Sequence, residues 1–239
     1  MYSKETLKKY TKNMRDTMNK YSEHFENMPG MAYHEICISK GNKKIGRVHN
    51  VSTAPIITCG NCSHCSGLCY DVKANIQYKN VMNARARNTI IATEHFEAFF
   101  TGIRYYIAHR KANKYFRWHV GGEIPSIEYF AEMVKTAEMF PDWTFWTYTK
   151  MHDIVNEYVA KNGRDSIPSN FTIMFSEWDG MPLNNPYDFP VFTCKLKDGN
   201  KNHPAEYFDT LYKCPGNCDI CKKAHRGCIA GETTYADEH

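Results

Sequence analysis

The sequence has no apolar run that approaches the roughly 20 consecutive residues needed to span a bilayer. Its first residues are charged and polar, so the apolar core of a secretory leader is also missing. Internal repeats and low-complexity stretches are absent, which argues against a solenoid and against a disordered chain. We therefore expect a cytoplasmic protein with no membrane partner.

The sequence also lacks a strong excess of one charge. The formal net charge is only +4, from 30 basic and 26 acidic residues. Such an excess permits a nucleic-acid partner but does not by itself indicate one. Hydrophobic residues make up 42% and aromatic residues 14% of the 239 positions, enough for a packed core. The composition therefore predicts a globular protein, of a size for one domain with appendages.

Cysteine is the residue type whose placement is most informative. Of the ten cysteines, only Cys37 and Cys194 lie alone in the sequence. The others fall in two short windows: Cys59, Cys62, Cys65 and Cys69, then Cys214, Cys218, Cys221 and Cys228. Disulfides are rare in a reducing cytosol, and bunched thiols are typical of metal ligands. We therefore predict two metal-binding groups, which we name the first and the second cysteine set.

The spacing within both sets favours iron–sulfur clusters. The first set reads C-x2-C-x2-C-x3-C within residues 59–69, and so short a loop can curl around a cubane. The second set begins with C-x3-C-x2-C, and its fourth thiol, Cys228, can close the site. The expected cofactors are thus two [4Fe–4S] clusters, with zinc as the alternative metal because thiolates bind both. A mixed arrangement across the fold is also open, joining Cys59, Cys62, Cys218 and Cys221.

Strand patterns alternate with helical patterns in the middle of the chain. We predict strands at 115–119, 143–149, 171–176 and 189–196. We predict helices at 78–110, 126–140 and 152–161. Such alternation implies a parallel sheet wound by right-handed crossovers. We therefore expect an α/β fold, a partial barrel of parallel strands with too few units for a complete eight-fold barrel.

Appendages are expected at both ends of this core. An apolar stripe predicts a helix over 3–27 with Ser3 as its N-cap, and two short segments, 33–39 and 44–51, predict a β-hairpin. The domain organisation that follows has an N-terminal helix and hairpin appendage, the partial barrel with the first cysteine set, and a cysteine-rich metal-binding cap. These parts span residues 1–52, 53–197 and 198–239.

A pair of glycines followed by an acid marks the end of the strand at 115–119. Gly121, Gly122 and Glu123 lie where parallel sheets bind ligands, and paired glycines let a ligand approach the backbone. His119 could donate a proton, bind a ligand or be a hydrogen-bonded structural residue. A tight strand–helix connection is the plain alternative for the turn. Weaker candidates follow other strands, namely Lys150, Glu177 and Asp179, whereas a solvated helix face is expected for Arg85 and Arg87.

The order of these motifs resembles the radical S-adenosylmethionine (SAM) enzymes. In that superfamily a three-cysteine loop follows the first strand of a partial barrel, and a Gly-Gly-Glu motif after the second strand contacts the SAM amino group. The resemblance implies that Gly121, Gly122 and Glu123 bind SAM, with Glu123 and His119 as catalytic residues. It also implies a 5′-deoxyadenosyl radical that acts on an unidentified substrate, and an electron donor such as flavodoxin or ferredoxin. The alternative is a non-catalytic zinc or iron–sulfur protein that binds nucleic acid or a protein partner.

A closer resemblance is to a phage protein family named gene product 88. The shared features are a loop ending in Cys-Tyr, an Arg-x-x-Asn helix, Arg-x-His before a Gly-acid turn, a strand ending in Tyr-Thr and a cysteine-rich tail. In this chain they are Cys65 to Tyr70, Arg85 with Asn88, Arg117 and His119 with Gly122-Glu123, Tyr148-Thr149, and Cys214 to Cys228. The resemblance spans about residues 55–228 and implies the host cytoplasm as the location.

Overall fold

The chain folds as two compact units whose segments alternate along the sequence. The computed structural model describes residues 2–43, 45–60 and 65–238. Unit 1 comprises Met1–Ser39, Asn50–Ala112 and His119–Pro125. Unit 2 comprises Lys40–His49, Asn113–Trp118 and Ser126–His239. The domain boundaries expected from the sequence, at residues 52 and 197, stay a prediction.

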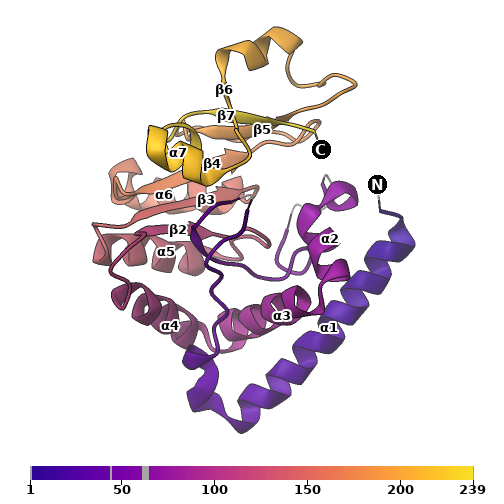
Figure 1. Ribbon diagram of the computed structural model, residues 1–239, viewed down its shortest axis with the longest axis vertical. Helices are drawn as coiled ribbons and strands as arrows, with labels where there is room; N and C mark the ends of the chain where they lie inside the picture. Colours follow the sequence, from indigo (N-terminus) through magenta and orange to yellow (C-terminus); the bar gives the residue numbers. More distant parts are fainter. Residues whose placement is uncertain (1, 44, 61–64, 239) are drawn as a thin grey trace. The chain divides into compact units, whose positions relative to one another are not determined.

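A parallel β-sheet organises the fold (Figure 1). Its strands are hydrogen-bonded in the order β1-β2-β3-β4-β5-β7-β6. Their bounds are β1 His49–Val51, β2 Tyr115–Trp118, β3 Thr144–Thr149, β4 Phe171–Ser176, β5 Val191–Lys195, β6 Tyr212–Lys213 and β7 Thr234–Asp237. Each pairing from β2 through β7 is parallel, and in this register Phe145 lies opposite both Phe116 and Phe171. The predicted α/β fold, an open sheet of the partial-barrel kind, is confirmed.

In unit 1 a long N-terminal helix packs along another helix. The helices of this unit are α1 (Lys4–Asn27), α2 (Tyr70–Gln77), α3 (Lys79–Glu94) and α4 (Phe96–Ala108). Ser3 caps α1 as predicted, since its Oγ accepts a hydrogen bond from the Thr6 N–H at 3.1 Å. The apolar stripe of α1 buries Tyr10 and Met14 against Ala86 of α3, and α1 runs beside α3 in Figure 1. The predicted helix over 78–110 is therefore two helices, which part at His95.

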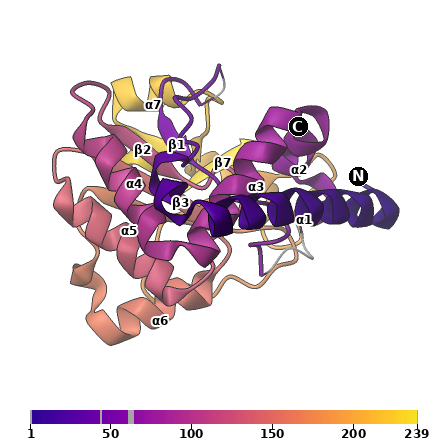
Figure 2. The same cartoon turned by 90° about the horizontal axis from the view of Figure 1, so that it is seen from below.

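In unit 2 helices cover both faces of the strands. Its helices are α5 (Ile127–Met139), α6 (His152–Asn162) and α7 (Cys218–Ala224). Figure 2 shows α7 on one side of the strands and α5 and α6 on the other. Neighbouring residues of β3 lie on opposite faces. Phe145 meets Phe171 edge to face, and Phe171 contacts Phe130 of α5, whereas Trp146 packs with Cys221 of α7. The alternation of side chains along β3 thus builds two apolar layers.

The segment between α1 and β1 is less regular than a hairpin. A 3-10 turn, Pro29–His34, follows α1. Two isolated antiparallel bridges, Ser39 with Asn50 and Asn42 with Gly46, represent the predicted hairpin. Strand structure is limited to β1 in this part of the described chain.

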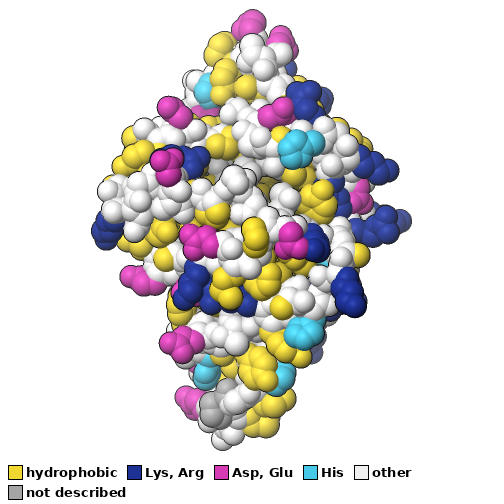
Figure 3. Space-filling view, turned by 90° about the vertical axis from the view of Figure 1, so that its left-hand side faces the viewer, with side chains coloured by type: hydrophobic (Ala, Val, Ile, Leu, Met, Phe, Trp, Pro, Cys, Tyr) yellow, Lys and Arg dark blue, Asp and Glu magenta, His cyan; other side chains and the backbone are white. Residues whose placement is uncertain are grey.

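The helices and one face of the surface can be described by their apolar and charged side chains. No described helix combines the length and apolar character that crossing a membrane requires. Figure 3 shows one face on which basic, acidic and hydrophobic side chains are interspersed.

Candidate metal and cofactor centres

The Gly-Gly-Glu turn is held by hydrogen bonds from the segment that follows β1. The Thr53 N–H donates to the Gly121 carbonyl oxygen at 3.1 Å, and Ser52 Oγ accepts from the Gly121 N–H at 3.2 Å. Thr58 Oγ1 accepts from the Glu123 N–H at 3.1 Å. These bonds join, within unit 1, two loops that follow the carboxyl ends of strands. That is the edge at which parallel sheets bind ligands.

Both glycines of this turn are required by their surroundings. A Cβ on Gly121 would collide with the Asp71 carboxylate, and a Cβ on Gly122 would collide with Thr53 Oγ1. Gly122 also has φ +83°, a conformation that favours glycine. The turn therefore places bare backbone against a carboxylate. His119 leads into it with φ +52°, an unusual value for a residue with a side chain.

Asp71, in the first turn of α2, belongs to a buried ion pair that the sequence did not reveal. Arg85 donates two hydrogen bonds to the Asp71 carboxylate, from Nη2 to Oδ1 at 3.1 Å and from Nε to Oδ2 at 3.2 Å. The two side chains are only 14% and 4% exposed. The expectation of a solvated helix face for Arg85 is therefore wrong, because its planar guanidinium matches a buried carboxylate. Arg87 also pairs, with Glu35 at 3.4 Å.

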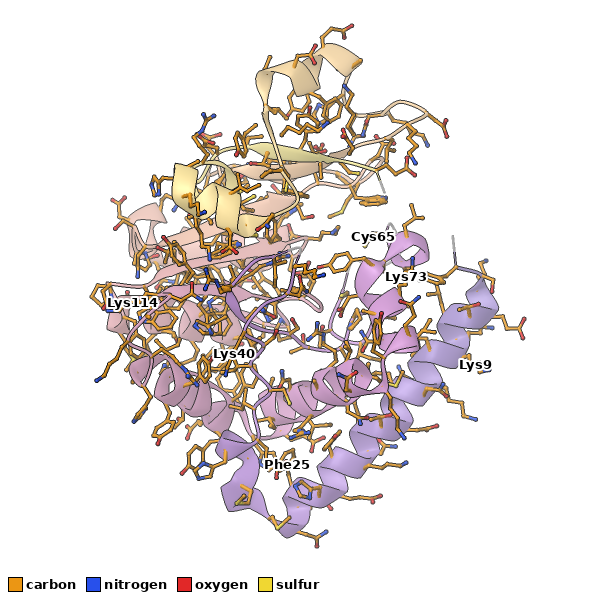
Figure 4. All side chains as sticks on the ribbon, in the orientation of Figure 1. Lys9, Phe25, Lys40, Cys65, Lys73 and Lys114 are labelled. Carbon is orange, nitrogen blue, oxygen red and sulfur yellow. The ribbon has the colours of Figure 1, made fainter. Side chains whose placement is uncertain are left out.

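Two described thiols of the first cysteine set lie next to this carboxylate. Cys69 is the N-cap residue of α2, and the nearby backbone N–H groups of Val72 and Asp71 lower the pKa of its thiol. The pKa of Cys69 is raised to about 11, chiefly by burial and also by the charges of Asp71 and Cys65, and these N–H groups partly offset the rise. Figure 4 shows Cys65 beside the start of α2. A bound cation would remove the cost that keeps this thiol protonated.

Tyr10 of α1 lies near Cys59 as well as near Cys69 and Asp71. Its hydroxyl donates to the Pro55 carbonyl oxygen at 3.3 Å. Burial raises the pKa of Tyr10, and the negative charges of Asp71, Cys69 and Cys59 raise it further. Cys59 and Cys69 therefore both lie close enough to this ring to act on it. Cys62, the fourth predicted ligand, lies outside the described residues.

The second cysteine set lies in unit 2, on the side of the strands that α7 covers. Cys218 and Cys221 belong to α7, and Cys228 lies in the 3-10 turn that follows it. Cys214 follows β6, and its N–H donates to the Tyr235 carbonyl oxygen of β7 at 2.7 Å. A charge on Cys214 raises the pKa of each of the other three thiols. The sheet and α7 thus bring all four sulfurs into one neighbourhood.

An arginine and a tyrosine on the strands face the second set. The Arg117 guanidinium lies 4.4 Å from the centre of the Tyr148 ring, a cation–π contact. The pKa of Cys228 is raised to about 12, chiefly by burial, and Tyr148, Thr234 and the charge of Arg117 partly offset the rise. Arg117 also lowers the pKa of Cys218, against the larger effect of burial. A partly buried cation beside thiols favours their thiolate forms, which are the forms that bind metals.

The described cysteine thiols are chemically suited to bind a metal, although the distances between them are not those of a formed metal site. All the described cysteines are free thiols. Across residues 2–43, 45–60 and 65–238, no three Cys, His, Asp or Glu side chains are already arranged to hold an ion. The thiols are partly or fully buried, and the rise in their pKa is partly offset by N–H groups near Cys69 in one set and by Arg117 in the other. Such thiols suit the thiophilic metals iron and zinc.

Further polar residues lie at the carboxyl ends of β3 and β4. Lys150 Nζ donates to Ser176 Oγ at 3.1 Å. Glu177 is 6% exposed and accepts a hydrogen bond from His203 Nε2 at 2.7 Å. His203 was not singled out because it lies far along the chain in a loop with no motif. The predicted catalytic residues Glu123 and His119 are likewise buried, at 8% and 3% exposure.

Fold and side chains together define an α/β protein with a parallel sheet and two thiol-rich centres, one in each unit. The family described as Gene product 88 matches residues 6–187, which include the first cysteine set and the Gly-Gly-Glu turn. The chain belongs to the gene product 88 family. No curated protein and no solved structure matches it.

Proposed function

We propose that the chain is an iron–sulfur protein of the radical-SAM kind, in which the first cysteine set and the Gly-Gly-Glu turn form one site. The observation that supports this most is the contact between Gly121 and Asp71, in the helix that Cys69 caps. This contact joins the turn to the cysteine loop. The chain order of strand, cysteine loop, second strand and Gly-Gly-Glu is also the order that the resemblance implies.

Each residue of this site has a distinct proposed role. The thiolates of the first set hold the cluster, and the second set holds another cluster or zinc. Gly121 and Gly122 offer backbone to the SAM amino acid group, and the Glu123 carboxylate accepts from its ammonium. His119 and the Asp71–Arg85 pair position the turn and α2. When bound, the reduced cluster and SAM supply the one-electron chemistry that yields a 5′-deoxyadenosyl radical and methionine.

The surroundings of the protein follow from this chemistry. A small reductant protein such as flavodoxin or ferredoxin supplies the electron, and the substrate is a molecule with a hydrogen that the radical removes. Thiolate-bound iron needs a reducing compartment, so we propose the host cytoplasm.

SAM binding and cleavage test the proposal directly. Protein purified without oxygen should contain iron and sulfide, and SAM should change the electron paramagnetic resonance signal of the reduced cluster. Reductant should release 5′-deoxyadenosine. Glu123→Gln should weaken SAM binding about tenfold or more, because a charge-assisted hydrogen bond is lost. The matched control is Glu128→Gln, on an exposed carboxylate, which should leave SAM binding unchanged.

Two other outcomes would contradict the proposal in different ways. Stoichiometric zinc without sulfide would favour the non-catalytic zinc protein. An intact cluster whose signal does not change with SAM would contradict the proposed enzyme activity and favour an electron carrier. The control Cys194→Ser, which changes a lone cysteine, should retain all metal.

A further inference from the structure

One face of α1 carries a basic groove that the proposed enzyme site does not use. The groove is a shallow surface of this one helix, open to solvent, and is lined by Lys4, Leu7, Lys8, Thr11, Lys12, Arg15, Asp16 and Asn19. All four of its cations are exposed. None of them forms an ion pair with a carboxylate in the described part of the chain. Asp16 is its single acid, since Glu5, Glu23 and Glu26 of α1 do not line it.

The spacing of these cations follows from helix geometry. Lys4, Lys8 and Lys12 are four residues apart, so they lie on one face and rise about 6 Å from one to the next. Arg15 extends the row to a length of about 16 Å. Burial of Tyr10 and Met14 against α3 fixes the rotation of α1 within unit 1, so the row is held outward by packing. It is a rigid row of point charges.

We propose that this face of α1 binds the phosphate backbone of double-stranded nucleic acid. Each strand of a duplex carries one phosphate charge per about 3.4 Å of axis, so a row of four cations about 16 Å long can neutralise up to four phosphates. The groove contains no aromatic side chain, which single-strand binding by base stacking would need. Its only large apolar side chain is Leu7, too little for an apolar partner helix.

Salt dependence of duplex binding tests this assignment. If four phosphates are neutralised, the slope of log affinity against log salt should be about −3.6 with duplex DNA. In the full chain carrying Lys8→Ala and Lys12→Ala, the slope should fall to about −1.8, with at least about tenfold weaker binding at low salt. Fluorescence anisotropy with a labelled duplex between about 50 and 200 mM salt measures both values.

A matched variant separates this face from net charge. Lys9→Ala with Lys20→Ala removes the same charge from exposed positions of α1 outside the groove, and Figure 4 shows Lys9 on the side of α1 away from α3. This control should keep the slope and the affinity of the unchanged protein. Alanine is the best helix former, so both variants should retain α1, as circular dichroism will show.

Duplex RNA, single-stranded DNA and polyglutamate complete the series. Binding of duplex DNA or duplex RNA in this salt-dependent way supports the proposal and identifies which duplex is preferred. Equal losses in the two double variants would overturn it, as would equal or tighter binding of polyglutamate or single strands. The duplex-binding measurement does not involve SAM, so its outcome is independent of the proposed enzyme function.

Discussion

At the scale of single residues, the site in unit 1 depends on Gly121, which has no side chain. Gly121 does not have a positive φ, so alanine would suit its backbone, but a Cβ there would meet the Asp71 carboxylate. We expect Gly121→Ala to lower the free energy of unfolding by about 1–3 kcal/mol, as overpacking does. Gly30→Ala is the control, because nothing lies within 4 Å of a Cβ there. Urea denaturation of both variants measures the difference. Equal midpoints would show that the turn can move to accommodate the Cβ without loss of stability.

A second residue-scale prediction concerns pH. Burial lowers the pKa of His152 below its usual 6.5, and the ring stacks on Phe175 at 4.6 Å. The folded protein therefore keeps this histidine neutral where the unfolded chain is already protonated. Its contribution to stability is complete above pH 6.5 and is lost as the pH falls below that value, by at most about 1.4 kcal/mol per pH unit.

Denaturation curves between pH 5 and pH 8 measure this effect as the slope of stability against pH. His152→Asn should make that slope shallower, because the titrating group is gone. His109→Asn changes an exposed histidine and should leave the slope as it was. A slope that His152→Asn does not alter would assign the pH dependence to other groups.

At the scale of helices and strands, local patterns predict well because each element is specified by its own residues. A helix was expected at 126–140, and at the start of α5 Ser126 Oγ accepts a hydrogen bond from the Tyr129 N–H at 3.2 Å. The strand expected at 143–149 is observed as Thr144–Thr149, and 171–176 is β4 without change. Caps and apolar periodicity act within a few residues, so a single sequence contains them.

Elements that depend on distant partners were harder to predict. The tail after residue 198 was expected to be a loop-rich cap, yet it adds β6 and β7 to the sheet. These strands are two and four residues long, and their hydrogen bonds come from each other and from β5 rather than from a strand pattern. The same reason explains the candidate sites. Bunched cysteines are visible in sequence, whereas Asp71 beside Gly121 and Arg117 beside Cys228 are contacts made only by folding.

At the scale of the whole molecule, the two cysteine sets belong to different units. Cys65 and Cys69 lie in unit 1, and Cys221 and Cys228 lie in unit 2. Within each unit the thiols act on one another's pKa, as Cys65 does on Cys69. Two separate centres remain our proposal, and the mixed arrangement remains the alternative.

Paired substitutions should divide the bound metal between these centres. Cys65→Ser with Cys69→Ser should remove about half of the metal and all SAM-dependent change, because the first set belongs to the same unit as the Gly-Gly-Glu turn. Cys221→Ser with Cys228→Ser should remove the other half and leave the SAM response, while lowering the stability of unit 2, whose core includes both sulfurs. Metal analysis and spectroscopy of both variants, beside the Cys194→Ser control, measure the division. If either pair alone removed all the metal, the centres would share ligands, and the mixed arrangement would replace the two separate sets.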